Sequence, residues 1–278
     1  MSVTSAERLW RGMTRSELDA AYNNGAAVAS SADKIAEWRE RSARLRARQP
    51  QLLDLCYADR PRNRIDVFTC GRDRAPLFVF IHGGYWQRNE KEIFSCMAEG
   101  PMADGFDVAL PGYTLAPEAS LTEIVAEVVA AVRWLRREGP AYRVAHGRLF
   151  VGGWSAGGHL TAMVMAMPEV DGGLAISGIF DVEPCRLNYL NDKLRLSAEE
   201  AQAMSPIHSL PQASGPLAVA YGTAELPELQ RQSQVYAQAR RDAHLTGSLL
   251  PLEGHDHFSI LEELATPGGR LVAALSTL

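Results

Sequence analysis

The chain has 278 residues, of which 46% are hydrophobic and 22% charged, and its net charge is −5 at pH 7. This composition is typical of a globular protein with a full-size core, and the mildly acidic balance argues against nucleic acid or an anionic membrane as partner. No apolar run reaches the roughly 18 residues of a membrane span, and residues 1–8 lack the apolar core of a signal peptide, so we expect a cytoplasmic protein.

The first fifty residues are expected to form a helical segment packed on the core. Within it, residues 32–48 combine Ile35, Trp38 and Leu45 with a cluster of five arginines. A basic helix can bind an anionic partner, but we favour a solvated helix that lies across the domain surface. The arginines are Arg39, Arg41, Arg44, Arg46 and Arg48.

From Leu52 onward, short apolar runs alternate with helical patterns. The best helix begins with a capping box, Ser120 to Glu123, and is stopped by Gly139-Pro140. Such alternation predicts an α/β domain over residues 51–278, with a mainly parallel central sheet flanked by helices. The predicted strands span residues 65–68, 77–81, 107–110, 149–152, 173–176, 217–221 and 248–250.

Residues 179–216 interrupt this alternation, because they are polar and contain several prolines. We interpret about 180–215 as a small cap-like insertion over the functional site. In a parallel sheet that site is expected beyond the carboxyl ends of the strands.

One motif follows the predicted strand at 149–152 directly. Gly153-Trp154-Ser155-Ala156-Gly157 leads into an apolar helical run. Gly-x-Ser-x-Gly between a strand and a helix is typical of a nucleophile elbow, a sharp turn that exposes the serine hydroxyl. We therefore predict Ser155 as a catalytic nucleophile.

A serine nucleophile needs a base and an acid that orients the base. In this fold class the chain order is serine, acid, histidine. His255 and His257 both lie just past the last predicted strand, and we favour His257 because Phe258 can pack against its ring. Glu225 is the first carboxylate after the penultimate strand and is the predicted acid. Its competitor, Glu228, is more simply interpreted as an acid in the first turn of a helix.

Negative charge on the substrate carbonyl oxygen requires backbone donors. The glycine-rich loop that begins at His82 follows a buried strand, and we expect the N–H groups of Gly84 and Tyr85 to donate, with Gly83 shaping the turn. The N–H of Ala156, next to the nucleophile, is the third expected donor. Three aromatic residues are candidates for the wall of an aryl pocket, although plain packing explains each equally well: Tyr85, Trp86 and Trp154.

Neither metal nor cofactor is expected. The four cysteines are scattered, with no C-x-x-C pair and no Cys/His cluster of zinc spacing, so we interpret them as reduced thiols. The glycine-rich loop also lacks the G-x-x-x-x-G-K-[ST] and G-x-G-x-x-G patterns of nucleotide sites.

With these motifs assembled, the chain resembles the α/β-hydrolase superfamily, near the hormone-sensitive-lipase-like esterases and most closely the kynurenine formamidase (arylformamidase) group. The resemblance is based on the segments 82–87 and 153–159, with support from 21–23, 65–68, 226–233 and 257–259. It assigns nucleophile, acid and base to Ser155, Glu225 and His257. The chain departs at the acid, since those formamidases usually carry aspartate where this chain has Glu225.

The resemblance implies a metal-free serine hydrolase that removes a small acyl group, formyl in the closest group, from an aryl amide or ester through an acyl-enzyme. N-formylkynurenine is the substrate it implies. A short-chain carboxylesterase and an amidase or imidase are the enzymatic alternatives, and a non-catalytic α/β-hydrolase scaffold for binding is the alternative of another class. The sequence leaves the acyl group, the leaving group and the oligomeric state open, a homodimer included.

Overall fold

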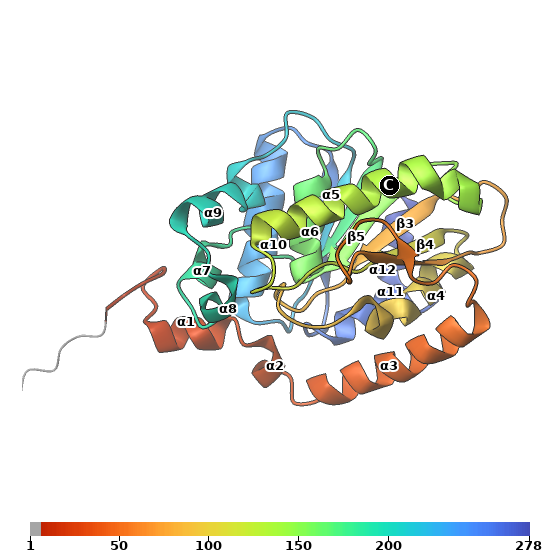
Figure 1. Cartoon of the computed structure of the whole chain (residues 1–278). Helices are drawn as coiled ribbons and strands as arrows, with labels where there is room; N and C mark the ends of the chain where they lie inside the picture. The colour runs from red at the N-terminus through yellow and green to blue at the C-terminus, as the bar shows by residue number, and fades with distance from the viewer. Residues whose placement is uncertain (1–6) are drawn as a thin grey trace, which may run out of the picture.

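The computed structural model describes residues 7–278, which form one eight-stranded sheet with helices on both faces (Figure 1). Residues 1–6, which bear on the expected absence of a signal peptide, lie outside this range. Within residues 7–278, no helix is both long and apolar enough to cross a membrane.

The sheet has the strand order β1-β2-β4-β3-β5-β6-β7-β8, in which β1 and β2 are antiparallel to their neighbours and β3 to β8 are parallel. The mainly parallel sheet expected from the sequence is therefore confirmed. The strands are β1 (Leu55–Cys56), β2 (Arg64–Phe68), β3 (Leu77–Ile81), β4 (Asp107–Pro111), β5 (Leu149–Trp154), β6 (Gly172–Ile176), β7 (Leu217–Gly222) and β8 (Gly247–Leu252). All seven predicted strands are present with ends within two residues of the prediction, and only the short β1 was not predicted.

Two hydrophobic cores lie on the two faces of the sheet, and β3 contributes to both. Leu77, Val79 and Ile81 belong to one core, whereas Phe78 and Phe80 belong to the other, as the two-residue period of a strand requires. The first core is covered by α5 (Leu121–Glu138), α6 (Ala156–Val164) and α10 (Pro227–Asp242). The second is covered by α3 (Ser31–Arg48), the 3-10 helix η1 (Lys91–Ala98), α4 (Glu99–Ala103), α11 (Glu262–Ala265) and α12 (Arg270–Ser276).

Helix α5 has the predicted capping box. The Ser120 side chain accepts from the N–H of Glu123, and the Glu123 carboxylate accepts from the N–H of Ser120 at 2.8 Å. The α-helix ends at Glu138, and Gly139 begins a 3-10 turn, η2 (Gly139–Tyr142), so the predicted stop is also confirmed.

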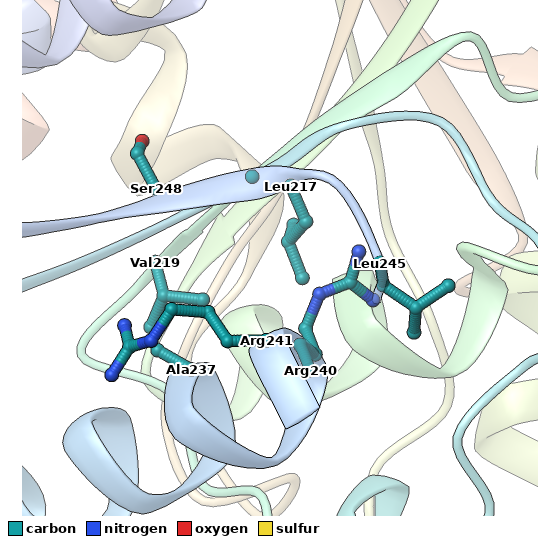
Figure 2. Close-up of a pocket in the computed structure, with 8 residues that line it drawn as sticks. Leu217, Val219, Ala237, Arg240, Arg241, Leu245 and Ser248 are labelled. Carbon is teal, nitrogen blue, oxygen red and sulfur yellow. The ribbon is translucent and has the colours of Figure 1, made fainter. Parts of the chain in front are cut away.

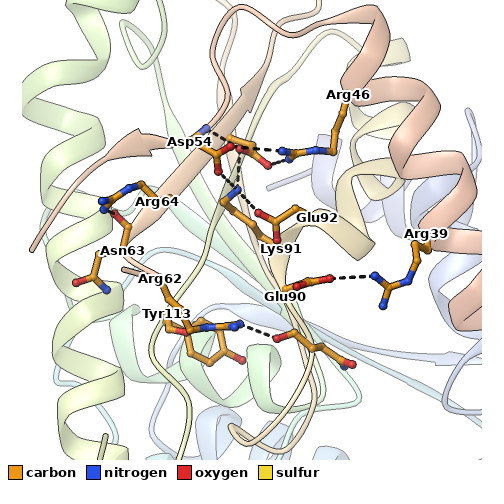
Figure 3. Close-up of polar contacts among 12 residues, drawn as sticks. Arg39, Arg46, Asp54, Arg62, Asn63, Arg64, Glu90, Lys91, Glu92 and Tyr113 are labelled. Atoms are coloured by element: carbon orange, nitrogen blue, oxygen red, sulfur yellow. Dashed lines mark hydrogen bonds and ion pairs between the residues drawn. The ribbon is translucent and has the colours of Figure 1, made fainter. Parts of the chain in front are cut away.

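Four of the five arginines of α3, all except Arg44, pair with carboxylates of the chain, and Figure 3 shows Arg39 and Arg46. Arg39 contacts Glu90 at 3.0 Å, and Arg41 contacts Glu262 at 2.8 Å. Trp38 on the same helix is fully buried in the second core. Helix α3 therefore lies across the domain surface, and much of its positive charge is used within the chain.

Lys91 anchors the end of the glycine-rich loop that starts at His82. Its side chain is only 4% exposed, and its ammonium group lies 2.6 Å from Asp54, 2.9 Å from Asp66 and 2.6 Å from Glu92 (Figure 3). A buried cation with three carboxylate partners is costly to displace, because removing either side leaves uncompensated charge. The loop therefore begins at the end of the buried strand β3 and ends at this cluster of ion pairs.

The segment interpreted as an insertion, 180–215, lies between β6 and β7. It consists of α7 (Glu183–Arg186), α8 (Asn191–Leu194), α9 (Ala198–Ala203) and the 3-10 turn η3 (Pro206–His208). In Figure 1 α7 and α8 (teal) lie beside the N-terminal α1 (Arg15–Ala21), and the N–H of Tyr189 donates to Asp19 of α1 at 2.8 Å. The side chain of Gln87 donates to the carbonyl of Leu190 at 2.7 Å, so the insertion also supports the glycine-rich loop.

Candidate functional site

Ser155 occupies the sharp turn between β5 and α6, as the motif predicts. Its backbone has φ +58° and ψ −117°, a strained conformation for a residue with a side chain. A Cβ at Gly153 would lie 2.5 Å from the carbonyl oxygen of Gly157, and one at Gly157 would overlap the carbonyl of Ile81. The turn is therefore possible only with glycine on both sides.

An acid–base pair lies next to this turn. Glu225 follows β7 and His257 follows β8, and Nδ1 of His257 is 2.9 Å from Oε2 of Glu225. The alternative histidine, His255, instead places Nε2 at 3.2 Å from Glu263 and is one-quarter exposed. Since the carboxylate only accepts hydrogen bonds, Nδ1 of His257 is the protonated nitrogen and Nε2 is left as the acceptor.

The carboxylate of Glu225 has two further donors, on its other oxygen. Ser177 donates its hydroxyl to Oε1 at 2.6 Å, and the N–H of Gly222 donates to the same atom at 2.7 Å. Sequence reasoning did not identify Ser177, because a single serine after a strand has no motif to mark it. The Glu225 side chain is fully buried.

Glu228, the competitor for the acid position, has the role expected of it. It lies in the first turn of α10 and forms an ion pair with Arg231 at 2.8 Å. The Glu228 carboxylate is thus held in an ion pair within its own helix.

A cavity of about 330 Å³ opens above Ser155 and His257, within the size range of small-molecule sites. Trp154, Phe258 and Ile35 give it an apolar side, and Arg88 gives it a cation. The N-terminal segment, residues 24–35, forms one wall of the cavity. No residue of the described stretch 180–215, which was expected to form a cap, lines the cavity. The lining residues are Asn24, Gly25, Ser31, Ala32, Ile35, Gly84, Tyr85, Arg88, Asn89, Trp154, Ser155, His257 and Phe258.

Trp154 joins the serine turn to the histidine loop. Its indole N–H donates to the carbonyl of His257 at 2.7 Å, and the two rings are 4.9 Å apart. This contact holds His257 against the turn that carries Ser155.

Three backbone N–H groups near Ser155 are free to bind an oxyanion. Within residues 7–278, those of Gly84, Tyr85 and Ala156 donate to no protein acceptor, and Ala156 is the first residue of α6, where no intrahelical acceptor exists. Gly84 has φ +123° and Tyr85 has φ +51°, which turns the loop sharply here. Gly83 lies against the serine turn, since a Cβ there would be 2.6 Å from the carbonyl oxygen of Trp154.

The aromatic candidates for the aryl pocket separate into two groups. Trp154 and Tyr85 line the cavity, although the Tyr85 hydroxyl donates to the carbonyl of Tyr22 at 2.6 Å and so also anchors the N-terminal segment. Trp86 does not line it: the ring is fully buried, and its N–H donates to Nδ1 of His159 at 3.2 Å. The assignment of Trp86 to a pocket wall is therefore corrected to core packing.

His82 and His159, which flank the two turn motifs, are completely enclosed. Nδ1 of His82 lies 2.8 Å from the carbonyl of Gly83, and Nε2 of His159 lies 2.7 Å from the carbonyl of Met204. Burial lowers the pKa of each from 6.5 to about 4. Both imidazoles are neutral at pH 7 and serve the packing of the turns.

The lowered pKa values of His82 and His159 predict that the protein loses stability in mild acid. Between about pH 6.5 and pH 4 the unfolded chain binds protons at His82 and His159 and the folded protein does not, so the free energy of unfolding falls as the pH falls. The expected slope is about 1.4 kcal/mol per pH unit for each histidine. In His159→Gln, denaturant unfolding should give a slope smaller by about that amount, and His208→Gln, at an exposed position, serves as control. Equal slopes in His159→Gln and the parent protein would contradict the assignment.

A second hollow lies at the opposite edge of the sheet. Figure 2 shows Leu217 and Arg240 beside it, where β7 begins and α10 ends. Its volume is about 10 Å³, enough for a single water, so it is not a ligand site. Within residues 7–278, no group of three or more His, Cys, Asp or Glu side chains has a metal-binding arrangement.

Comparison with known proteins agrees with this fold. Residues 65–174 match the family model BD-FAE. The kynurenine formamidase of Danio rerio is 30% identical over 276 residues, which cover 92% of this chain and 93% of that protein. The chain belongs to the α/β-hydrolases, in the group that contains the kynurenine formamidases and related esterases.

Solved structures of other α/β-hydrolases share the fold. A candidate thioesterase from Silicibacter sp. TM1040 has a TM-score of 0.84 and 31% identity, and the match covers 94% of this chain and 99% of that one. A thermophilic esterase from Thermogutta terrifontis has a TM-score of 0.66 and 20% identity, with 81% and 92% covered. Like these relatives, this α/β-hydrolase is an enzyme of the esterase and formamidase type.

Proposed function

We propose that the protein is a serine hydrolase that removes a formyl or similarly small acyl group from an aryl amide or ester. The observation that supports it best is the 2.9 Å contact of Glu225 with His257, which lines the cavity together with Ser155. A base with a fixed tautomer beside a serine on a strained turn is what nucleophilic catalysis requires.

The reaction proceeds in two halves. Oγ of Ser155 attacks the carbonyl carbon while Nε2 of His257 takes the hydroxyl proton, and Glu225 stabilises the imidazolium. The amine leaves with the proton from Nε2, and the acyl group stays on Ser155 as an ester. Water then attacks the carbonyl carbon of this ester and gives a proton to Nε2. Nε2 passes the proton to Oγ as the bond between Oγ and the acyl carbon breaks, which restores the serine hydroxyl and releases the acid.

The oxyanion of each tetrahedral intermediate is bound by the free N–H groups of Gly84, Tyr85 and Ala156. Such donors act where charge develops, and the loss of one typically costs about 3 kcal/mol of transition-state stabilisation. The loop can hold this geometry because Lys91 anchors its far end and Gln87 fixes it to the insertion.

N-formylkynurenine is the substrate we propose, from the names of the relatives and from the cavity. Its aryl ring suits the apolar side made by Trp154, Phe258 and Ile35. Its carboxylate suits Arg88, an exposed arginine that forms no ion pair with a carboxylate in the described part of the chain, residues 7–278.

A substrate series tests this proposal. The kcat/KM for N-formylkynurenine should exceed those for formanilide, which has no carboxylate, and for short p-nitrophenyl esters. In Arg88→Ala the KM for N-formylkynurenine should rise about three- to ten-fold while formanilide is unaffected, as expected for a partly solvated charge pair. Arg44→Ala, at an exposed position of α3 outside the cavity lining, is the matched control. Faster turnover of the esters, with no Arg88 effect, would instead favour a short-chain carboxylesterase, a class that the esterase relatives represent.

A further inference from the structure

Ser177 lies directly after β6, the strand between the one that leads to Ser155 and the one that leads to Glu225. It is fully buried, and its N–H donates to the carbonyl of Ala220 on β7 at 2.7 Å. Its hydroxyl therefore cannot turn to solvent, and the acceptor it reaches is Oε1 of Glu225 at 2.6 Å.

The backbone of Ser177 is in the left-handed region, with φ +51°. Glycine adopts this conformation without cost, whereas a residue with a Cβ loses about 1 kcal/mol or more there. The backbone conformation alone would therefore favour glycine at this position, yet the chain has serine there. The contact that the side chain gains is the charge-assisted hydrogen bond to Glu225.

The carboxylate of Glu225 needs such a contact for two reasons. Its side chain is fully buried, and among residues 7–278 its only ion-pair partner is His257, so neutral donors must stabilise the charge. Glutamate also has one more rotatable bond than aspartate. The Ser177 hydroxyl and the Gly222 N–H hold Oε1, and this leaves Oε2 facing Nδ1 of His257.

We propose that Ser177 is a positioning residue of this active site. Its hydroxyl fixes the rotation of the Glu225 carboxylate and thereby the orientation of the His257 ring. Ser177 lines no part of the cavity and acts through Glu225, so it should affect the chemical step and leave substrate binding unchanged. This inference rests on the proposed serine mechanism.

The test compares Ser177→Gly and Ser177→Ala with the parent enzyme. Glycine suits φ +51°, so the Gly variant should fold and decides the outcome if the Ala variant does not. Both should lower kcat about 10- to 100-fold, the effect of losing a hydrogen bond to a charged group, with KM within about two-fold. Ser233→Ala is the matched control, because it removes a buried hydroxyl on α10 that has no hydrogen-bond partner among residues 7–278.

A double-mutant cycle separates positioning from a general structural effect. In a Glu225→Ala background, Ser177→Ala should change kcat by less than about two-fold, since the group it holds is gone. Wild-type kcat in both Ser177 variants, or an undiminished loss in the Glu225→Ala background, would overturn the proposal. Ser155→Ala is measured alongside: if it keeps full activity, the serine mechanism itself fails, whereas an inactive Ser155→Ala with unaffected Ser177 variants rejects only the role of Ser177.

Discussion

Replacing Ser155 with alanine is expected to lower kcat by about five to six orders of magnitude or to the limit of detection. The alanine side chain at position 155 has no atom that can attack the substrate carbonyl, whereas His257 and Glu225 keep their contact. Alanine is also smaller than serine at a turn with no room to spare, so the fold should be retained.

The kcat of Ser155→Ala is measured with formanilide and with a chromogenic acetyl ester, each at saturating concentration. Ser95→Ala is the control, because it removes a buried hydroxyl of η1 that has no hydrogen-bond partner in the described part of the chain. Near-normal hydrolysis of both substrates by purified Ser155→Ala would show that another group attacks the carbonyl.

His257→Gln should have an effect of similar size, a loss of about five orders of magnitude in kcat, because the serine then has no base. His255→Gln is the matched control two residues away. His255 pairs with Glu263 at 3.2 Å and does not line the cavity, so its replacement should change kcat by less than about three-fold.

The comparison of the two histidine variants needs the same substrates and a check of folding by circular dichroism. A large loss of kcat in His255→Gln with a small loss in His257→Gln would assign the base to His255 instead of His257. Comparable small losses in both would argue that the acid–base pair does not serve the reaction.

The strands and the serine turn could be predicted from local patterns alone. The run Leu77–Ile81 is apolar without interruption because the strand is buried on both faces, and the glycines around Ser155 leave few alternatives to a tight turn. The order of the remaining loops follows from the parallel sheet, which is why Glu225 and His257 could be proposed together from positions 32 residues apart.

What could not be predicted depends on contacts between distant segments. Asn24 and Ile35 line the cavity because the N-terminal segment lies over it, and no periodicity encodes that placement. Trp86 looked like a pocket wall from its place in the loop, yet the ring turns into the core to meet His159. Ser177 has no sequence signal, since its role depends on the hydroxyl reaching a residue 48 positions later.

The most direct test of an activated hydroxyl at Ser155 is covalent labelling with a fluorophosphonate, followed by mapping of the adduct by mass spectrometry. We expect one adduct per chain, on Ser155, which is absent in Ser155→Ala and forms far more slowly in His257→Gln. An enzyme that hydrolyses its substrate normally while Ser155 stays unlabelled, or an adduct on a different residue, would contradict it.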